Sequence, residues 1–173
     1  MTLTEKIVQI ANSYIGQKEK PNNSGFIDPL FEKKQKARGW LNGQAWCAYT
    51  GELIWYEAFT EFDACAVSLI NKYFSGSAVQ SYKNFKTSPE FKVRKEPILG
   101  GILIWQHGDS EQGHMGCCVS IKDANNVGSV EGNTNTAGGR EGIEVALKNR
   151  KLNLPFTATG LNYLGCVWPI RIK

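Results

Sequence analysis

The sequence lacks any apolar stretch that could cross a membrane. No run approaches the roughly 20 consecutive apolar residues that a spanning helix needs. The first 16 residues also lack the continuous apolar core of a secretory signal, because Glu5, Lys6 and Asn12 interrupt it. We therefore expect no integral membrane association, and synthesis in the cytoplasm without a Sec signal. A substrate at the cell wall or in the periplasm would then require release or injection by another system.

Histidine is scarce and cysteine is odd in number. With two histidines and five cysteines, a complete set of disulfide bonds is excluded and at least one thiol is free. No cysteine pair has the spacing of about two to four residues that is typical of zinc sites, and the adjacent Cys117 and Cys118 cannot easily share a metal. A Walker-type phosphate loop is also missing, since the glycine-rich stretch at Gly138, Gly139 and Gly142 has the pattern of a hairpin turn. We expect neither a metal nor a cofactor.

What the sequence does have is the composition of one globular domain. Its 173 residues, 42% of them apolar and 21% charged, suffice for a single hydrophobic core, so we expect one domain over residues 1–173. The formal net charge of +4 favours anionic partners, among which nucleic acid, anionic membranes and cell-wall polymers all qualify. No recognised DNA-reading motif is present, so nucleic acid is not an expected partner.

The N-terminal half has the hydrophobic pattern of helices. Thr2 and Glu5 are placed as a capping box for the first helix, and Gly16 is placed to end it. Residues 17–44 are rich in proline, glycine and asparagine, which predicts a surface loop around one short helix. The main predicted helices cover residues 3–15, 46–62 and 66–86, the last divided near Ser75 and Gly76.

After Pro97 the pattern changes to short β-rich runs bounded by glycine, asparagine and proline. Helices followed by strands predict an α+β fold. The predicted strands cover residues 102–106, 114–122, 126–131, 143–148 and 160–172.

Two residues have the surroundings of a nucleophile and its base. Cys47 begins a predicted helix, where unpaired backbone N–H groups lower the pKa of a thiol and raise its thiolate fraction. His114 opens a strand after a glycine-containing loop, so its ring can lie at the edge of a sheet. The alternatives are a small buried residue for Cys47 and a solvated loop histidine for His114, as for His107.

Glu131 and Asn133 follow on the next predicted strand and share a face if that strand continues. A carboxylate or amide there would orient the imidazole while its other nitrogen takes the thiol proton, although a polar strand end is the alternative. Cys118 has the strand parity of His114, but the two are separated by roughly 13 Å, beyond hydrogen-bond reach. We expect core positions for the remaining cysteines, Cys65, Cys117, Cys118 and Cys166.

Three stretches resemble, in order, the CHAP family of papain-like cysteine amidases and peptidases: QAWCAYTGELIW, GGILIWQHGDSEQGHMGCCVSI and SVEGNTN. In that family a cysteine begins a helix, a histidine after a loop opens a strand, and a glutamate with an asparagine two residues later completes the site. The resemblance spans about residues 4–168 and departs at Ile102, where an aspartate is common in the family.

The resemblance implies a papain-like CHAP domain in which N-terminal helices pack on a C-terminal antiparallel sheet. It makes Cys47 the nucleophile, His114 the base, and Glu131 and Asn133 the groups that orient it. Gln44, three residues before Cys47, is a candidate oxyanion donor, with a simple loop residue as the alternative. The family's calcium loop is not matched and is not carried over. Four tryptophans are candidates for the substrate groove, with core as the alternative for the last two: Trp40, Trp46, Trp55 and Trp105.

Family members commonly cleave peptidoglycan, either as N-acetylmuramoyl-L-alanine amidases or as crosslink endopeptidases, and a basic surface suits an anionic wall. The resemblance therefore implies a monomeric wall hydrolase similar to a phage lysin. An amidase toxin injected into a competitor is the alternative, and would come with a delivery factor or an immunity protein. Also open are a cysteine peptidase with a non-wall substrate and a papain-like scaffold that binds a ligand without cutting it.

Overall fold

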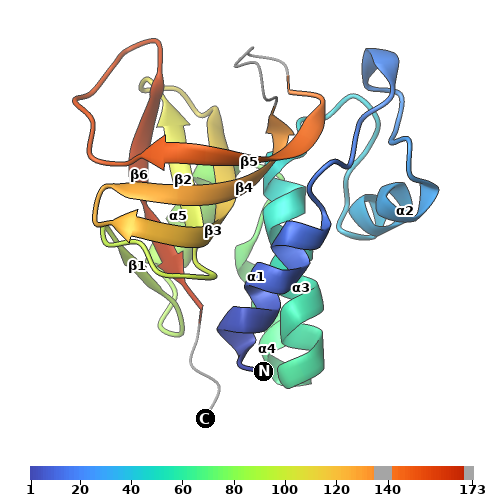
Figure 1. Ribbon diagram of the computed structural model, residues 1–173, viewed down its shortest axis with the longest axis horizontal. Coiled ribbons are helices and arrows are strands. Elements are labelled where there is room, and N and C mark those ends of the chain that lie inside the picture. Colours follow the sequence, from blue (N-terminus) through green and yellow to red (C-terminus); the bar gives the residue numbers. More distant parts are fainter. Residues whose placement is uncertain (135–141, 170–173) are drawn as a thin grey trace.

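A computed structural model describes residues 1–134 and 142–169 of the chain (Figure 1). Within these residues all α-helices precede a six-stranded sheet, so the fold is α+β as the sequence predicts. The helices are α1 (Leu3–Ser13), α2 (Pro29–Ala37), α3 (Cys47–Phe62), α4 (Ala64–Tyr73) and α5 (Ala78–Lys86). The strands are β1 (Lys92–Arg94), β2 (Ile102–His107), β3 (Gly113–Asp123), β4 (Asn126–Thr134), β5 (Glu144–Lys151) and β6 (Leu161–Trp168).

The first helix begins where the capping box predicts. The Thr2 hydroxyl accepts a hydrogen bond from the Glu5 N–H, and the Glu5 carboxylate accepts one from the Thr2 N–H. Gly16 follows the helix with a φ of +93°, the left-handed conformation that glycine adopts without strain. Ile7 and Ala11 turn one side of α1 into the core, where they have no exposed surface.

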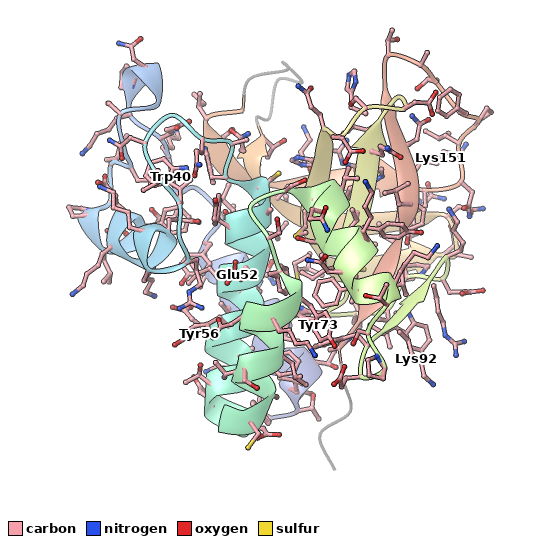
Figure 2. All side chains as sticks on the ribbon, turned by 180° about the vertical axis from the view of Figure 1, so that it is seen from behind. Trp40, Glu52, Tyr56, Tyr73, Lys92 and Lys151 are labelled. Carbon is pink, nitrogen blue, oxygen red and sulfur yellow. The ribbon has the colours of Figure 1, made fainter. Side chains whose placement is uncertain are left out.

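The segment between α1 and α3 contains α2, but it does not lie wholly on the surface as predicted. Phe26, Phe31 and Trp40 have no exposed surface. The ring centroid of Phe26 lies 4.8 Å from that of Trp40 and 4.9 Å from that of Trp46. Figure 2 shows Trp40 between α2 and the loop that leads to α3. The prediction of a surface loop is wrong here because the free energy gained by burying three large aromatic rings exceeds the cost of burying part of an irregular, polar segment.

Helix α3 is the central helix, since it contacts α1, α2 and α4 as well as strands β3 and β4. Leu53, Ile54 and Trp55 along it are buried. The break between α4 and α5 falls where predicted, and the Ser77 hydroxyl caps α5 by accepting from the Gln80 N–H. Among the helices of the described ranges, none combines the length and apolar character that crossing a membrane requires.

The sheet has the order β1-β6-β2-β3-β4-β5, and each neighbouring pair is antiparallel. The predicted strands all correspond to observed ones, but β1 was not predicted. Its three residues hold only one partly buried apolar side chain, Val93, between two exposed cations, which gives no hydrophobic signal. The predicted turn at Gly138 and Gly139 and the predicted end of the last strand at 170–172 lie outside the described residues.

The two faces of the sheet bury separate clusters. One face packs against α1, α3 and α5 and forms the main core together with them. Figures 1 and 2, which view the molecule from opposite sides, show α5 lying across one face of the sheet, with α1, α3 and α4 beside it. The other face holds a smaller buried cluster: Leu103, Trp105, Cys118, Val127, Leu152 and Cys166. Neighbouring residues of β3 belong to different clusters because side chains alternate along a strand.

Candidate active site

Cys47 is the first residue of α3, at the end of the helix that borders the sheet. The preceding residue, Trp46, makes no side-chain cap, so no side chain of that residue satisfies the N–H groups of the first turn. Cys47 is 6% exposed and lines an open cleft. A ligand carbonyl that reached the thiol would therefore lie near the positive end of the helix.

His114, at the start of β3, has neighbours on two sides of its ring. The Cys47 side chain lies near enough to the ring to contribute to a raised His114 pKa. Its Nε2 lies 2.8 Å from Oε2 of Glu131, which leaves Nδ1 for the thiol. Because an ionised carboxylate can only accept, Nε2 carries a proton and Nδ1 is the nitrogen left open toward Cys47. The fold thus brings together the two residues for which the sequence predicts the roles of nucleophile and base.

Glu131 lies on β4 and has no exposed surface. In the pairing of β3 with β4, Cys117 lies opposite Val130, which places Gly116 beside Glu131. A Cβ atom at Gly116 would stand 2.6 Å from Cγ of Glu131 and 2.2 Å from Oγ of Ser129. A glycine at this position therefore makes room for the carboxylate between the strands.

Arg150, on β5, is a partner of Glu131 that sequence reasoning missed. Its Nε donates to Oε1 of Glu131 at 2.7 Å, and its Nη2 donates to Oε2 at 2.5 Å. Such two-pronged pairing is the strongest geometry that an arginine and a carboxylate adopt. One signal could have found it: Arg150 shares strand parity with Ala146, which lies opposite Glu131. Using that signal requires the pairing register, which the sequence does not give.

The charges of this cluster shift two pKa values in opposite directions. Burial by itself lowers the pKa of His114, but hydrogen bonds and negative charge from Cys47 and Glu131 outweigh burial and raise it. Burial by itself raises the pKa of Glu131, but hydrogen bonds and positive charge from Arg150 and His114 outweigh it and lower the pKa to about 2. The carboxylate is therefore ionised at neutral pH, and an imidazolium beside it is favoured.

Asn133 lines the cleft but does not continue the strand geometry that places Glu131. The β4–β5 pairing is irregular between Glu131 and Thr134, and Asn133 has a φ of +51°. Within residues 1–134 and 142–169 its side chain makes no hydrogen bond. The residue that contacts His114 in this structure is therefore Glu131, while Asn133 faces the space that a ligand would enter.

Gln44 also lines the cleft, in the loop before Cys47. Its Oε1 accepts hydrogen bonds from the Leu41 N–H at 3.1 Å and from the Tyr49 hydroxyl at 3.2 Å. With the carbonyl oxygen held in this way, the Nε2 group is the part of the amide that can donate to an oxyanion.

The cleft has a volume of about 900 Å³. It lies between the loop before α3, the start of α5, the strand ends around His114 and the segment 159–161. Hydrogen-bonding side chains from four strands line it: His107, His114, Asn133, Thr134, Lys148 and Arg150. No phenylalanine, tyrosine or tryptophan is found among its described lining residues.

The tryptophans predicted for the groove lie in the interior instead. Trp40, Trp46 and Trp55 have no exposed surface, so the groove prediction is wrong for Trp40 and Trp46, and the core alternative holds for Trp55. Trp105 is also buried, although it contacts the site, since its ring lies beneath the Arg150 guanidinium at 5.3 Å. Neighbouring aromatic rings supply enough contact to bury these indoles fully.

All five cysteines are free thiols. Burial raises the pKa of Cys118 and of Cys166 to about 12, and raises that of Cys117 as well, so these three stay protonated at neutral pH. Their predicted core positions are confirmed. The same prediction is wrong for Cys65, which lies exposed in the first turn of α4.

The described part of the chain contains no group of three or more histidine, cysteine, aspartate or glutamate side chains placed to hold a metal ion. His114, Glu131 and Arg150 instead form a hydrogen-bonded line, and Cys47 lies beside its His114 end. Such an arrangement can activate a thiol, attack a carbonyl and return a proton to a leaving group. Comparison of the chain with family models, curated proteins and solved structures found no match, so the functional assignment rests on this geometry.

Proposed function

We propose that the protein is a cysteine hydrolase that cleaves an amide bond of bacterial peptidoglycan, with the papain-like site of a CHAP domain. The observation that carries this proposal is the meeting of Cys47 and His114 at the wall of an open cleft, with His114 held by Glu131 through Nε2. A structural cysteine needs no base, and a buried histidine needs only one partner. These three residues have instead the order of nucleophile, base and orienting carboxylate.

In the first half of the reaction, the Cys47 thiol gives its proton to Nδ1 of His114, and the thiolate attacks the amide carbonyl. A carbon–sulfur bond forms as the carbonyl electrons move onto oxygen. Backbone N–H groups at the start of α3 and the Nε2 group of Gln44 would donate to that oxyanion. Glu131 keeps the imidazolium in place through Nε2.

In the second half, the oxyanion collapses and the carbon–nitrogen bond breaks. The imidazolium of His114 protonates the leaving amine, which departs, and Cys47 holds the acyl group as a thioester. Water then gives a proton to His114 and attacks the thioester. The carboxylic acid product leaves, and the proton returns to the Cys47 sulfur.

The cleft and the net charge support a hydrophilic, anionic substrate. The lining is mostly polar and carries Lys148 and Arg150 on one side, and the whole chain has a net charge of +4. Peptidoglycan stem peptides are short, polar and rich in carboxylates. The bond cut would join glycan to stem peptide or lie within a crosslink. Such an enzyme would serve phage lysis or act as an injected antibacterial amidase.

The test is digestion of purified peptidoglycan by the wild-type protein and by Cys47→Ala, with the soluble products identified by mass spectrometry. We expect fragments from the wild type and at least about a thousand-fold slower release from Cys47→Ala, because the nucleophile is lost. Cys65→Ser is the matched control, since it removes an exposed thiol outside the cleft and should leave release unchanged.

The fragment masses would identify the bond. Intact peptidoglycan from several wall chemistries, with a folded protein whose Cys47 still reacts with alkylating agents, would refute the wall assignment. That outcome would instead favour a cysteine peptidase with a different amide substrate. Release of fragments by Cys47→Ala at the wild-type rate would refute the catalytic assignment itself.

A further inference from the structure

The Glu131 carboxylate is held by two cationic partners, and only one of them takes part in the reaction described above. Oε2 of Glu131 accepts from Nε2 of His114 and also from Nη2 of Arg150, while Oε1 accepts from Nε of Arg150. Two of these three hydrogen bonds come from Arg150. The arginine therefore fixes the plane of the carboxylate, and with it the direction in which His114 donates.

Arg150 is itself held in place. Its guanidinium lies over the Trp105 ring, and the Trp105 ring centroid lies 6.2 Å from that of His114. Its side chain retains 25% of its exposure, on the side that lines the cleft. The arginine thus packs against Trp105 on one side and is exposed to solvent on the side that lines the cleft.

Burial makes this contact necessary. A carboxylate with no exposed surface is unstable in its charged form unless charged partners surround it. If Glu131 took up a proton, it would lose the negative charge that holds the imidazolium beside Cys47. His114 gains and loses a proton during each turnover, so its positive charge is not always beside Glu131. Arg150 stays charged throughout.

We propose that Arg150 is a positioning residue of the site: it keeps Glu131 ionised and correctly oriented, and through Glu131 it holds the His114 ring against Cys47. This inference rests on the proposed function, because positioning matters only if Cys47 and His114 react. Arg150 itself need not touch the substrate.

The prediction that follows concerns pH. Without Arg150, Glu131 should take up a proton more readily, and a neutral Glu131 no longer holds the His114 imidazolium, so Cys47 should react only at higher pH. The other ionisable groups of the cleft come from β2, from the loop after it and from β5: His107, Glu111 and Lys148. Glu111 is paired with Lys83 of α5. Arg150 makes two hydrogen bonds to Glu131, so it is the cation whose loss should matter most.

The experiment measures the rate at which iodoacetamide alkylates Cys47 between pH 4 and pH 9, in a Cys65→Ser background that removes the exposed thiol. For Arg150→Gln we expect the low-pH limb of the profile to move up by about one unit or more, as a charge lost a few ångströms away should cause. The rate at pH 5 should fall about tenfold. Arg150→Lys keeps the charge but cannot donate two parallel hydrogen bonds to Glu131. The low-pH limb of its profile should therefore move by less than half as much.

Lys151→Gln is the matched control, because it removes the same charge from the next residue of β5 (Figure 2). Neighbouring strand residues point to opposite faces, and Lys151 is exposed, so its profile should match the parent. Equal shifts for Arg150→Gln and Lys151→Gln, or for Arg150→Gln and Arg150→Lys, would overturn the proposal. So would an unmoved limb in a folded Arg150→Gln protein.

A measurement on the Arg150-containing protein covers the case in which Arg150→Gln does not fold. The carbon-13 chemical shift of the Glu131 carboxyl should show it still ionised at pH 4, and a transition near its ordinary value of 4.5 would overturn the proposal. Neither readout needs a substrate. If the wall assignment is wrong, peptidoglycan stays intact while the low-pH limb of the alkylation profile still moves in Arg150→Gln. If the present inference is wrong, that limb does not move although the wild-type protein cuts peptidoglycan.

Discussion

Strands β3 and β4 bury very different side chains on their two faces. On the helix side, Met115, Cys117 and Val130 pack into the apolar main core. On the other side, His114 is 9% exposed and Glu131 is 0% exposed, so this face excludes water almost as completely. The first face is dry because its groups are apolar. The second face also buries the apolar Cys118 and Val127, but its charged groups are buried because they are paired with one another. The kind of partner, and not burial, therefore separates a site from a core.

The difference has an energetic consequence. Replacing an apolar side chain removes contacts and leaves a cavity, and the cost does not depend on pH. Removing one member of a buried charge cluster leaves the others unpaired in a dry environment, and the cost changes as those groups titrate. Substitutions on the two faces should therefore differ most clearly in their pH dependence.

The largest effect is expected for Glu131→Ala. It leaves a buried, protonated His114 and the partly exposed Arg150 without their counter-charge, so the free energy of unfolding at pH 6 should fall by about 3–5 kcal/mol. Urea denaturation measures that change. A loss below about 1 kcal/mol would show that solvent reaches the cluster and that the comparison of the two faces is wrong.

Met115→Ala provides the control on the opposite face. It should cost about 2–5 kcal/mol, because a fully buried side chain is lost from the main core. Alkylation of Cys47 should stay close to the wild-type rate in this variant, whereas in Glu131→Ala it should fall sharply at low pH.

The signs of the two pKa shifts define a pH window for the Glu131→Ala effect. The pKa of Glu131 is lowered from 4.5 to about 2, so its stabilisation is present above pH 4.5 and is lost as the pH falls through about 2. The pKa of His114 is raised from 6.5, so its stabilisation is complete below pH 6.5 and is lost as the pH rises through the folded value. The difference between wild type and Glu131→Ala should therefore be greatest between pH 4.5 and 6.5. The Met115→Ala difference should be flat.

A smaller effect is expected for Gly116→Ala. The new Cβ would collide with Ser129 and Glu131, so the carboxylate must shift, at a cost of about 1–3 kcal/mol. Cys47 alkylation at pH 5 should slow, because His114 loses its aligned acceptor. Gly128→Ala is the control: its Cβ meets the hydroxyl of Ser120 on the same strand pair, away from the cleft, and alkylation should not change. Equal slowing in both variants would indicate general strain in the sheet.

The residues of the site differ in how far sequence could predict them. Cys47 and His114 stand at element starts that breakers and hydrophobic patterns mark, and Glu131 follows on the adjacent strand, where antiparallel pairing brings it to the histidine. Arg150 could not be found in this way. It stands in a basic stretch, KNRK, in which any of three cations fits the pattern. The β4–β5 register places Arg150 opposite Val127, on the face of Glu131, and only the folded side chains show that Arg150 reaches the carboxylate.

The fold was predictable where periodicity is strong and was missed where it is weak. The capping box of α1 and the break before α5 follow from local chemistry. Strand β1 carries no hydrophobic alternation that would predict it. It is a strand because it pairs with β6, which lies far away in the sequence. The burial of Trp40 depends on Phe26 and Trp46, which are brought together only by the tertiary structure.

The smallest effect is expected for Cys118→Ala, and it tests whether Cys118 of β3 is a reactive thiol in addition to Cys47 of α3. Cys118 has the strand parity of His114, yet it packs with Leu103 and Trp105, and burial raises its pKa to about 12. In the Cys65→Ser background, Cys118→Ala should cost about 1 kcal/mol in urea denaturation and leave alkylation at pH 6 unchanged. If Cys118 were the nucleophile, the same substitution would abolish rapid alkylation, and Cys47→Ala would not. The position of Cys47 at a helix terminus, beside an imidazole, would then no longer explain which thiol reacts.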